Sequence, residues 1–151
     1  MNHSCYQELS YEQILQNIQS DGFCYLALAS EQGVPSVNAM MYAYTYHDKR
    51  LVIYMAASEN SETIHILKGN NAVDILLMRR QPMMNAYCYD SVHLTGCAIK
   101  IADENEQAYI YDLLLRREKE TRRYMEKCMN EQDAVFFKID IESSSGRRYN
   151  F

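Results

Sequence analysis

The sequence has no tryptophan and contains only two prolines and five glycines among its 151 residues. It also lacks an apolar run of about 20 residues, the length that a membrane-spanning helix needs, so no membrane segment is predicted. Basic residues are in the minority, because 15 Lys and Arg stand against 20 Asp and Glu, for a net charge of −5. Nucleic-acid backbones are bound mainly by clustered Lys and Arg, so a nucleic-acid partner is not expected. The 48% hydrophobic and 23% charged residues are typical of a soluble globular protein.

No C-x-x-C spacing occurs, and the cysteines are odd in number, with five in the chain. This pattern favours reduced thiols in a cytoplasm over a framework of disulfides. The first ten residues, MNHSCYQELS, lack the basic and apolar segments of a secretory signal. Because the length suits one hydrophobic core, we expect a single cytoplasmic domain over residues 1–151.

Several catalytic motifs are also missing, namely G-x-S-x-G, the Walker A loop and G-x-G-x-x-G. His93 and Cys97 share a face of one predicted strand, but a metal site needs three or four convergent ligands. We therefore predict no metal site, and no residue is identified as a catalytic acid or base.

Alternating and continuous apolar segments predict a mainly β protein. Ser10 and Gln13 form a capping-box pattern that begins a first helix, a second helix is expected over about 61–68 before Gly69, and a longer one begins near Asp103. The segment 23–30 is almost continuously apolar, which predicts a strand covered on both faces. The six expected strands cover residues 23–30, 36–45, 51–57, 72–78, 91–101 and 133–142. Short loops between them indicate a mostly antiparallel arrangement, which we interpret as an α+β fold with a small closed barrel and two or three peripheral helices.

The order of these segments carries a resemblance to a known family. It extends through FCYLALASEQGVPSVNAMMYAYTYHDKRLVIYMAASENSETIHILKGNNAV and continues in SVHLTGCAIKI, so that it covers roughly residues 10 to 141. Gly33 and Pro35 lie in the first turn, and a polar loop and short helix follow the third strand. This plan resembles the pyridoxamine 5′-phosphate oxidase-like family of FMN-binding split barrels, and it is most similar to the branch with the nitroimidazole-resistance proteins.

The resemblance implies a homodimer with two FMN sites at the subunit interface. In the family, the second and third strands line the flavin ring, and the loop and helix start after the third strand hold the phosphate. Carried over by position, the cofactor-binding residues of this chain would be Asn38, Met40, Met41, Met55, Ser58, Asn60, Ser61 and Thr63. Without the resemblance, Ser58 to Thr63 would be interpreted as ordinary helix capping, and the methionines as core or interface residues.

The sequence departs from the family at the expected phosphate site. Family members that bind FMN tightly place basic residues near Glu62 and Thr63, and the oxidases place one near Asn38. A carboxylate at Glu62, with Glu59 close by, would repel a phosphate dianion. The remaining attraction is the positive end of a helix and the polar side chains around it. Compensating arginines could come from elsewhere in the dimer, and the candidates are Arg79, Arg80, Arg147 and Arg148.

Two classes of function therefore stay open. The first is a flavin-dependent oxidoreductase that acts on a small aromatic acceptor, such as a nitroaromatic, quinone-like or pyridoxal-type compound. The second is a split-barrel dimer without turnover that holds haem, a deazaflavin or no cofactor. Haem would call for an axial ligand among His3, His47, His65 and His93. A flavin spectrum in the purified protein would separate an FMN protein from a barrel without cofactor.

Overall fold

A computed structural model describes residues 5–20, 22–81, 87–117, 122–123, 126 and 133–150. Three helices are formed by its described residues, α1 (Tyr11–Ser20), α2 (Glu62–Gly69) and α3 (Glu104–Arg117). The strands are β1 (Tyr6–Glu8), β2 (Phe23–Ala29), β3 (Pro35–Met41), β4 (Ala43–His47), β5 (Arg50–Ser58), β6 (Ala72–Arg80), β7 (Cys88–Lys100) and β8 (Ala134–Asn150). None of the described helices is long and apolar enough to cross a membrane.

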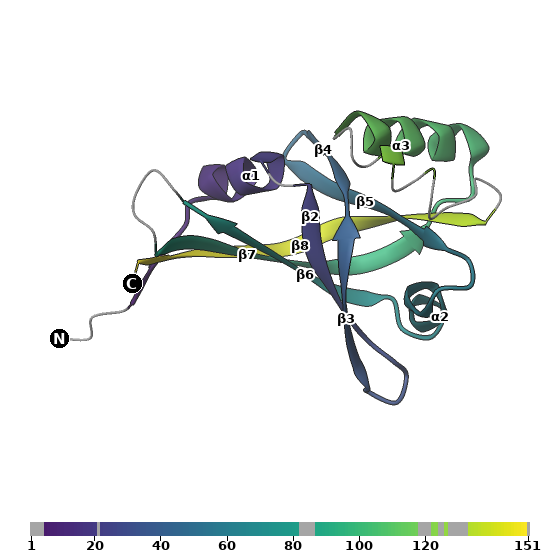
Figure 1. The fold of residues 1–151 in the computed structure, drawn as a ribbon, viewed down its shortest axis with the longest axis horizontal. Helices are drawn as coiled ribbons and strands as arrows, with labels where there is room; N and C mark the ends of the chain where they lie inside the picture. The colour runs from purple at the N-terminus through teal and green to yellow at the C-terminus, as the bar shows by residue number, and fades with distance from the viewer. Residues whose placement is uncertain are drawn as a thin grey trace.

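The strands form one antiparallel sheet in the order β3-β2-β6-β7-β8-β5-β4, and β1 pairs with β8 beside this path. The two ends of the path, β3 and β4, are consecutive in the chain and are separated by Tyr42 alone. The sheet therefore curls until its edges meet, which encloses the core as in a barrel (Figure 1). The predicted α+β, mainly antiparallel fold is confirmed.

The number of strands differs from the expected six. The expected strand over 36–45 is interrupted at Tyr42, whose hydroxyl donates a hydrogen bond to the carbonyl of Ile18 at 2.7 Å. Tyr42 is buried, and beyond it the chain continues as the separate strand β4. The other addition is β1, a short polar segment that pairs with the end of β8. Its polar composition gave no strand signal in the sequence.

The core consists of two clusters on either side of β5. Met55 and its inward neighbours fill the barrel, whereas Tyr54 and its outward neighbours pack under α3, against Ile110 and Leu114.

The strand β2 is covered on one side only, because the burial of its residues alternates along the strand. Cys24 and the other inward side chains are buried, whereas the outward Phe23 and Tyr25 are exposed and the remaining outward residues are half-buried within this chain. The expectation that residues 23–30 are covered on both faces is thus wrong for the single chain.

β7 and β8 are long strands of 13 and 17 residues. With β1 and the end of β6 they extend beyond the barrel as an arm, and the C-terminus lies at its tip (Figure 1). α1 lies along the arm at its junction with the barrel. α2 lies at the other end of the barrel, where β5 leads into it.

Candidate functional site

The start of α2 is organised by Ser61, the residue that caps this helix. Its hydroxyl oxygen accepts a hydrogen bond from the backbone N–H of Ile64 at 3.3 Å. Its own N–H donates to the carbonyl of Ser58, the last residue of β5, at 2.9 Å. The predicted helix is present and ends at Gly69, but its C-cap is Asn70 in extended conformation, so Gly69 is the last helical residue and does not act as a left-handed stop. Strand end, polar turn and helix start are thereby held in one fixed arrangement.

Asn38 and Thr63 meet across the split between β3 and α2. The side-chain amide of Asn38 donates to the hydroxyl oxygen of Thr63 at 3.3 Å, although the two residues are 25 positions apart. A longer contact of 3.4 Å joins the same amide to the hydroxyl of Ser36. Thr63 is only 6% exposed. The structure therefore brings together polar groups from two predicted segments, beside the positive end of a helix.

The acidic residues at this site are not equivalent. The carboxylate of Glu59 lies 3.1 Å from the ammonium of Lys68. The backbone N–H of Glu59 donates a hydrogen bond to the carbonyl of Asp133 at 2.7 Å. Glu62 is exposed and forms no ion pair with a described residue. Since Lys68 compensates the charge of Glu59, Glu62 contributes the main repulsion toward an anion at the start of α2.

A hollow on the exposed side of this helix start adds Lys68, which the sequence analysis did not select, and His65, which it named only as a candidate haem ligand. The hollow is lined by Glu59, Asn60, Ser61, Glu62, His65 and Lys68. His65 and Lys68 follow Ser61 by four and seven positions, the spacing that places residues on one helical face. That spacing is the sequence signal that identifies them. The neutral hydroxyls and amides around the start of α2 are donors that fit a phosphate group, whereas the one lysine of the hollow is already paired with Glu59.

The remaining predicted site residues are more dispersed. Met40 is half-buried against the core, and Met41 lies opposite Phe23 on the outer side of the sheet. Met55 is fully buried inside the barrel. Ser58 ends β5, and Asn60 is exposed in the turn that follows. The polar members of the predicted set therefore lie around one helix start, whereas the methionines divide between core and surface.

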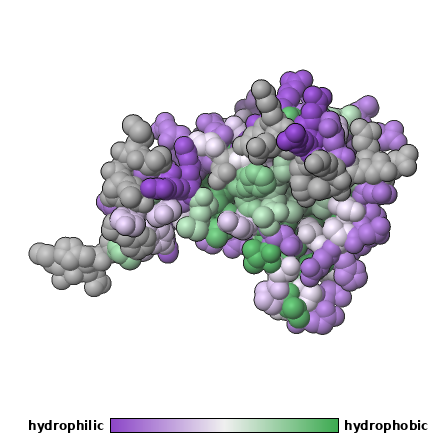
Figure 2. All heavy atoms as spheres, in the orientation of Figure 1, coloured by the Kyte–Doolittle hydropathy of each residue, from purple (hydrophilic) through white to green (hydrophobic). Residues whose placement is uncertain are grey.

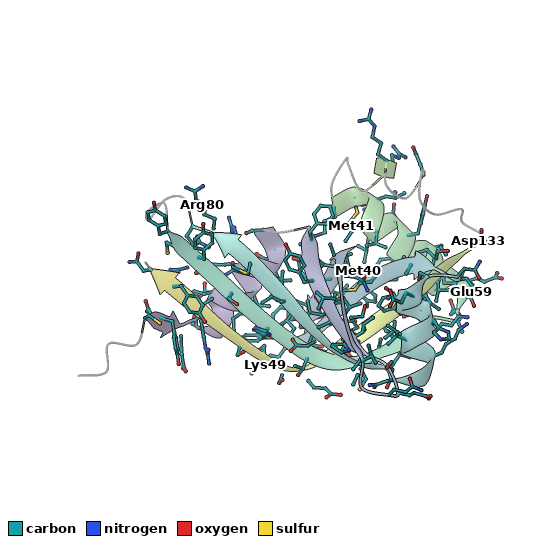
Figure 3. The ribbon with its side chains drawn as sticks, turned by 60° about the horizontal axis from the view of Figure 1, so that its bottom comes forward. Met40, Met41, Lys49, Glu59, Arg80 and Asp133 are labelled. Atoms are coloured by element: carbon teal, nitrogen blue, oxygen red, sulfur yellow. The ribbon has the colours of Figure 1, made fainter. Side chains whose placement is uncertain are left out.

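Arginines on the arm do not reach this site within one chain. Figure 3 shows Arg80 at one end of the molecule, and Glu59 and Asp133 next to each other at the other end. The side chain of Arg148 binds Asp90, and the guanidinium of Arg147 lies 4.4 Å from the ring centre of Tyr6. Any arginine contribution from the arm would have to come from a second chain.

An exposed apolar surface covers the outer side of β2, β3 and β6, and we call it the outer face. Its most exposed residues are Phe23 (48%), Tyr25 (49%), Val37 (64%) and Met78 (52%). Phe23 pairs with Met41 and Tyr25 with Ala39 and Leu76, so the face also includes these residues. Figure 2 shows hydrophobic residues gathered at the centre of this side, with hydrophilic residues around them. Apolar patches of this kind mark interaction surfaces.

A histidine on β7 borders the outer face, and it is one of the candidate axial ligands for haem that the sequence analysis named. Nδ1 of His93 lies 3.3 Å from a carboxylate oxygen of Asp74, and His93 is paired with Leu76 in the sheet. About half of each side chain is exposed. The sequence separates these residues by 19 positions, so only the β6–β7 register reveals their contact.

The family model described as pyridoxamine 5′-phosphate oxidase matches residues 10–148. The chain therefore belongs to this family, which confirms the resemblance found in its sequence. No curated protein gives a significant sequence match.

Solved structures with the same fold include flavin and haem proteins. A FAD-binding protein of Mesorhizobium loti superposes with a TM-score of 0.79 at 21% identity, over 96% of this chain and 99% of its own. A protein of Bacteroides thetaiotaomicron proposed to confer 5-nitroimidazole resistance gives 0.70 at 18% identity, over 95% and 87%. The haem storage protein of Vibrio cholerae gives 0.64 at 14% identity, over 88% and 90%.

Proposed function

We propose that this protein binds FMN and that the phosphate lies at the start of α2. The observation that carries the proposal is the hydrogen bond between Asn38 and Thr63, because it places donors from β3 and α2 beside a helix N-terminus. Ser58, Asn60 and Ser61 surround the same point. Family membership supports a flavin, as do the flavin proteins among the structures with this fold.

We further propose that the working form is a homodimer built on the outer face, with residues 1–151 as one domain. β2 is apolar on both sides but is covered on one side only in the single chain, and a second copy would bury the other side. Arg147 lies on the same side of the sheet as Met78, because both pair with Ser91. A partner subunit is thus our proposed source of the arginine that the phosphate site lacks.

The proposed activity is oxidation–reduction of a small aromatic acceptor, such as a nitroaromatic, quinone-like or pyridoxal-type compound. FMN, when bound, supplies the electron transfer, and the protein contributes binding and orientation. Exposed Phe23 and Tyr25 on the outer face offer rings against which a planar acceptor could stack. We place the protein in the cytoplasm, because Cys5, Cys24, Cys88 and Cys97 are free thiols.

Haem is the second candidate cofactor. The haem storage protein of Vibrio cholerae has the same fold, and this chain offers His93 beside the outer face and His65 in the hollow at α2. His3 lies outside the described residues. A haem complex would show an intense Soret absorption band instead of flavin absorption, and His93→Ala or His65→Ala would shift or remove it.

FMN titration of the purified protein, followed by flavin fluorescence, tests the proposal. We expect saturable binding by the unaltered chain and clearly weaker binding by the double variant Asn38→Ala, Thr63→Ala, because it loses both donors that meet across the split. Asn105→Ala removes an exposed amide from α3 and serves as the matched control with unchanged affinity. Equal FMN affinity for the double variant and the unaltered chain would refute the proposed phosphate position.

A further inference from the structure

A second cavity lies on the barrel side of α2, and nothing in the flavin proposal uses it. It is lined by Glu59, Ile64, Leu67, Lys68, Ala98, Lys100, Val135 and Phe137. Five of these residues are apolar, and they come from α2, β7 and β8. Barrel mouths are among the places where proteins bind small molecules. This cavity is such a mouth, because α2 lies over the open end of the curled sheet.

The size of the cavity sets the size of its ligand. Its volume is about 150 Å³. An engineered apolar cavity of about 150 Å³ in another protein binds benzene, so one aromatic ring fits this space. The wall formed by β7 is low at this point, because Ala98 has only a methyl group and the preceding buried position of the strand is Gly96. Ala98, Ile64 and Phe137 are each less than one-tenth exposed, so they offer a ring a largely desolvated wall.

The charges at the mouth set the polarity of the ligand. Lys100 lies opposite Phe137 in the β7–β8 register and is exposed. Among the residues that the structure describes, Lys100 has no ion-pair partner. Lys68 is paired with Glu59 at 3.1 Å. The mouth therefore carries one net positive charge, and the uncompensated ammonium is that of Lys100.

We propose that this cavity binds a single-ring aromatic carboxylate. The ring occupies the space between Ile64, Ala98 and Phe137, and the carboxylate forms an ion pair with Lys100 at the mouth. A neutral ring would gain the same apolar contacts but would leave Lys100 without a partner. The inference does not depend on FMN binding, although Glu59 and Lys68 also line the hollow at the start of α2.

Benzoate titration of isotope-labelled, flavin-free protein, followed by amide NMR shifts, tests this inference. We expect saturable shifts centred on Ile64, Ala98 and Val135, and weaker binding of benzamide, which has the same ring without the charge. Lys100→Gln should weaken benzoate binding several-fold and leave benzamide binding unchanged. Lys49→Gln is the matched control, because Lys49 is exposed in the turn at the other end of β5.

Ala98→Leu should abolish binding of both compounds by filling the cavity, and circular dichroism would establish that this variant is folded. If it does not fold, the surface variant Lys100→Gln decides alone. Absence of saturable benzoate shifts, or shifts centred away from these residues, overturns the proposed site. Equal affinities of the unaltered chain for benzoate and benzamide overturn the choice of a carboxylate. Equal benzoate affinities of the Lys100→Gln variant and the unaltered chain overturn it as well.

Discussion

The guanidinium of Arg148 donates two hydrogen bonds to the carboxylate of Asp90, at 2.7 and 2.8 Å. Asp90 is 1% exposed and also accepts from the side-chain amides of Asn17 and Gln81, at 2.9 and 3.0 Å. The four residues come from α1, the end of β6, β7 and β8. This buried network therefore joins α1 to the arm.

Asp90→Asn should destabilise the fold strongly, because it leaves the partly buried guanidinium of Arg148 without its counter-charge. We expect a loss on the order of 3 kcal/mol in the free energy of unfolding, the range for breaking a buried ion pair from one side. Asp140 provides a matched control, because Arg50 binds it with two hydrogen bonds of 2.7 Å at the surface. Asp140→Asn should cost no more than about 1 kcal/mol. Urea unfolding measures both, and equal losses would contradict the role assigned to burial.

The same network makes stability depend on pH in the acid range. Burial raises the pKa of Asp90, but the hydrogen bonds from Arg148, Asn17 and Gln81 outweigh it, so the pKa is lowered overall. The unfolded chain therefore takes up this proton first, at about pH 3.9. The stabilisation is complete above that pH and is lost as the pH falls through the lower pKa of the folded state.

Urea unfolding at a series of pH values from about 6 to 2 measures this effect. Asp90→Asn should show a shallower loss of stability below about pH 4 than the unaltered chain. Asp140 also has a lowered pKa, through its hydrogen bonds with Arg50, so some acid sensitivity should remain in the variant. Parallel curves for the two proteins would show that Asp90 is not the group that titrates.

Tyr25→Arg should separate the proposed dimer into monomers. Tyr25 is at the centre of the outer face and pairs with Ala39 and Leu76, so a second copy would bury the new charge. Because an unpaired buried charge costs several kcal/mol, the dimer dissociation constant should rise by about 100-fold or more. Light scattering after size exclusion gives the masses. Tyr109→Arg makes the same change at an equally exposed tyrosine of α3 and should remain dimeric, whereas a dimeric Tyr25→Arg would place the interface elsewhere.

Local signals in the sequence predicted much of the fold. The capping box is present, since the N–H of Ser10 donates to the side chain of Gln13 and the N–H of Gln13 donates to the hydroxyl of Ser10. The start of α2 was predicted for the same reason, because the Ser61 cap acts within one turn of the helix. The break at Tyr42 was not predicted. It depends on the contact with Ile18, a residue 24 positions away.

The residues of the candidate site also divide into those with a local signal in the sequence and those whose contacts depend on the folded arrangement. Ser61 could be selected because its capping role is local, and Asn38 through family position. The pairing of Glu59 with Lys68, and of His93 with Asp74, required the folded arrangement of strands and helices. The apolar segment 23–30 predicted a strand covered on both faces, but the single chain covers only one of them. Composition alone does not show which face of an apolar strand the rest of the chain covers, because that depends on the sheet order and on the placement of distant elements.

Glu62→Lys should tighten FMN binding if the phosphate lies at the start of α2. Glu62 is the first residue of this helix and is exposed, so the variant exchanges a repelling charge for an attracting one without changing the core. We expect roughly fivefold higher affinity at low salt, the size of a surface ion pair. The gain should shrink as added salt shortens the range of the interaction.

Glu104→Lys is the matched control, because Glu104 is the exposed first residue of α3. Both variants lose a carboxylate that favours a helix N-terminus, at a similar cost of about 0.3–1 kcal/mol in stability. Only Glu62→Lys changes the charge beside Asn38 and Thr63. Fluorescence titration with FMN at two salt concentrations distinguishes them. If the two variants bind FMN equally, Glu62 does not face the phosphate, and the site must be sought away from α2.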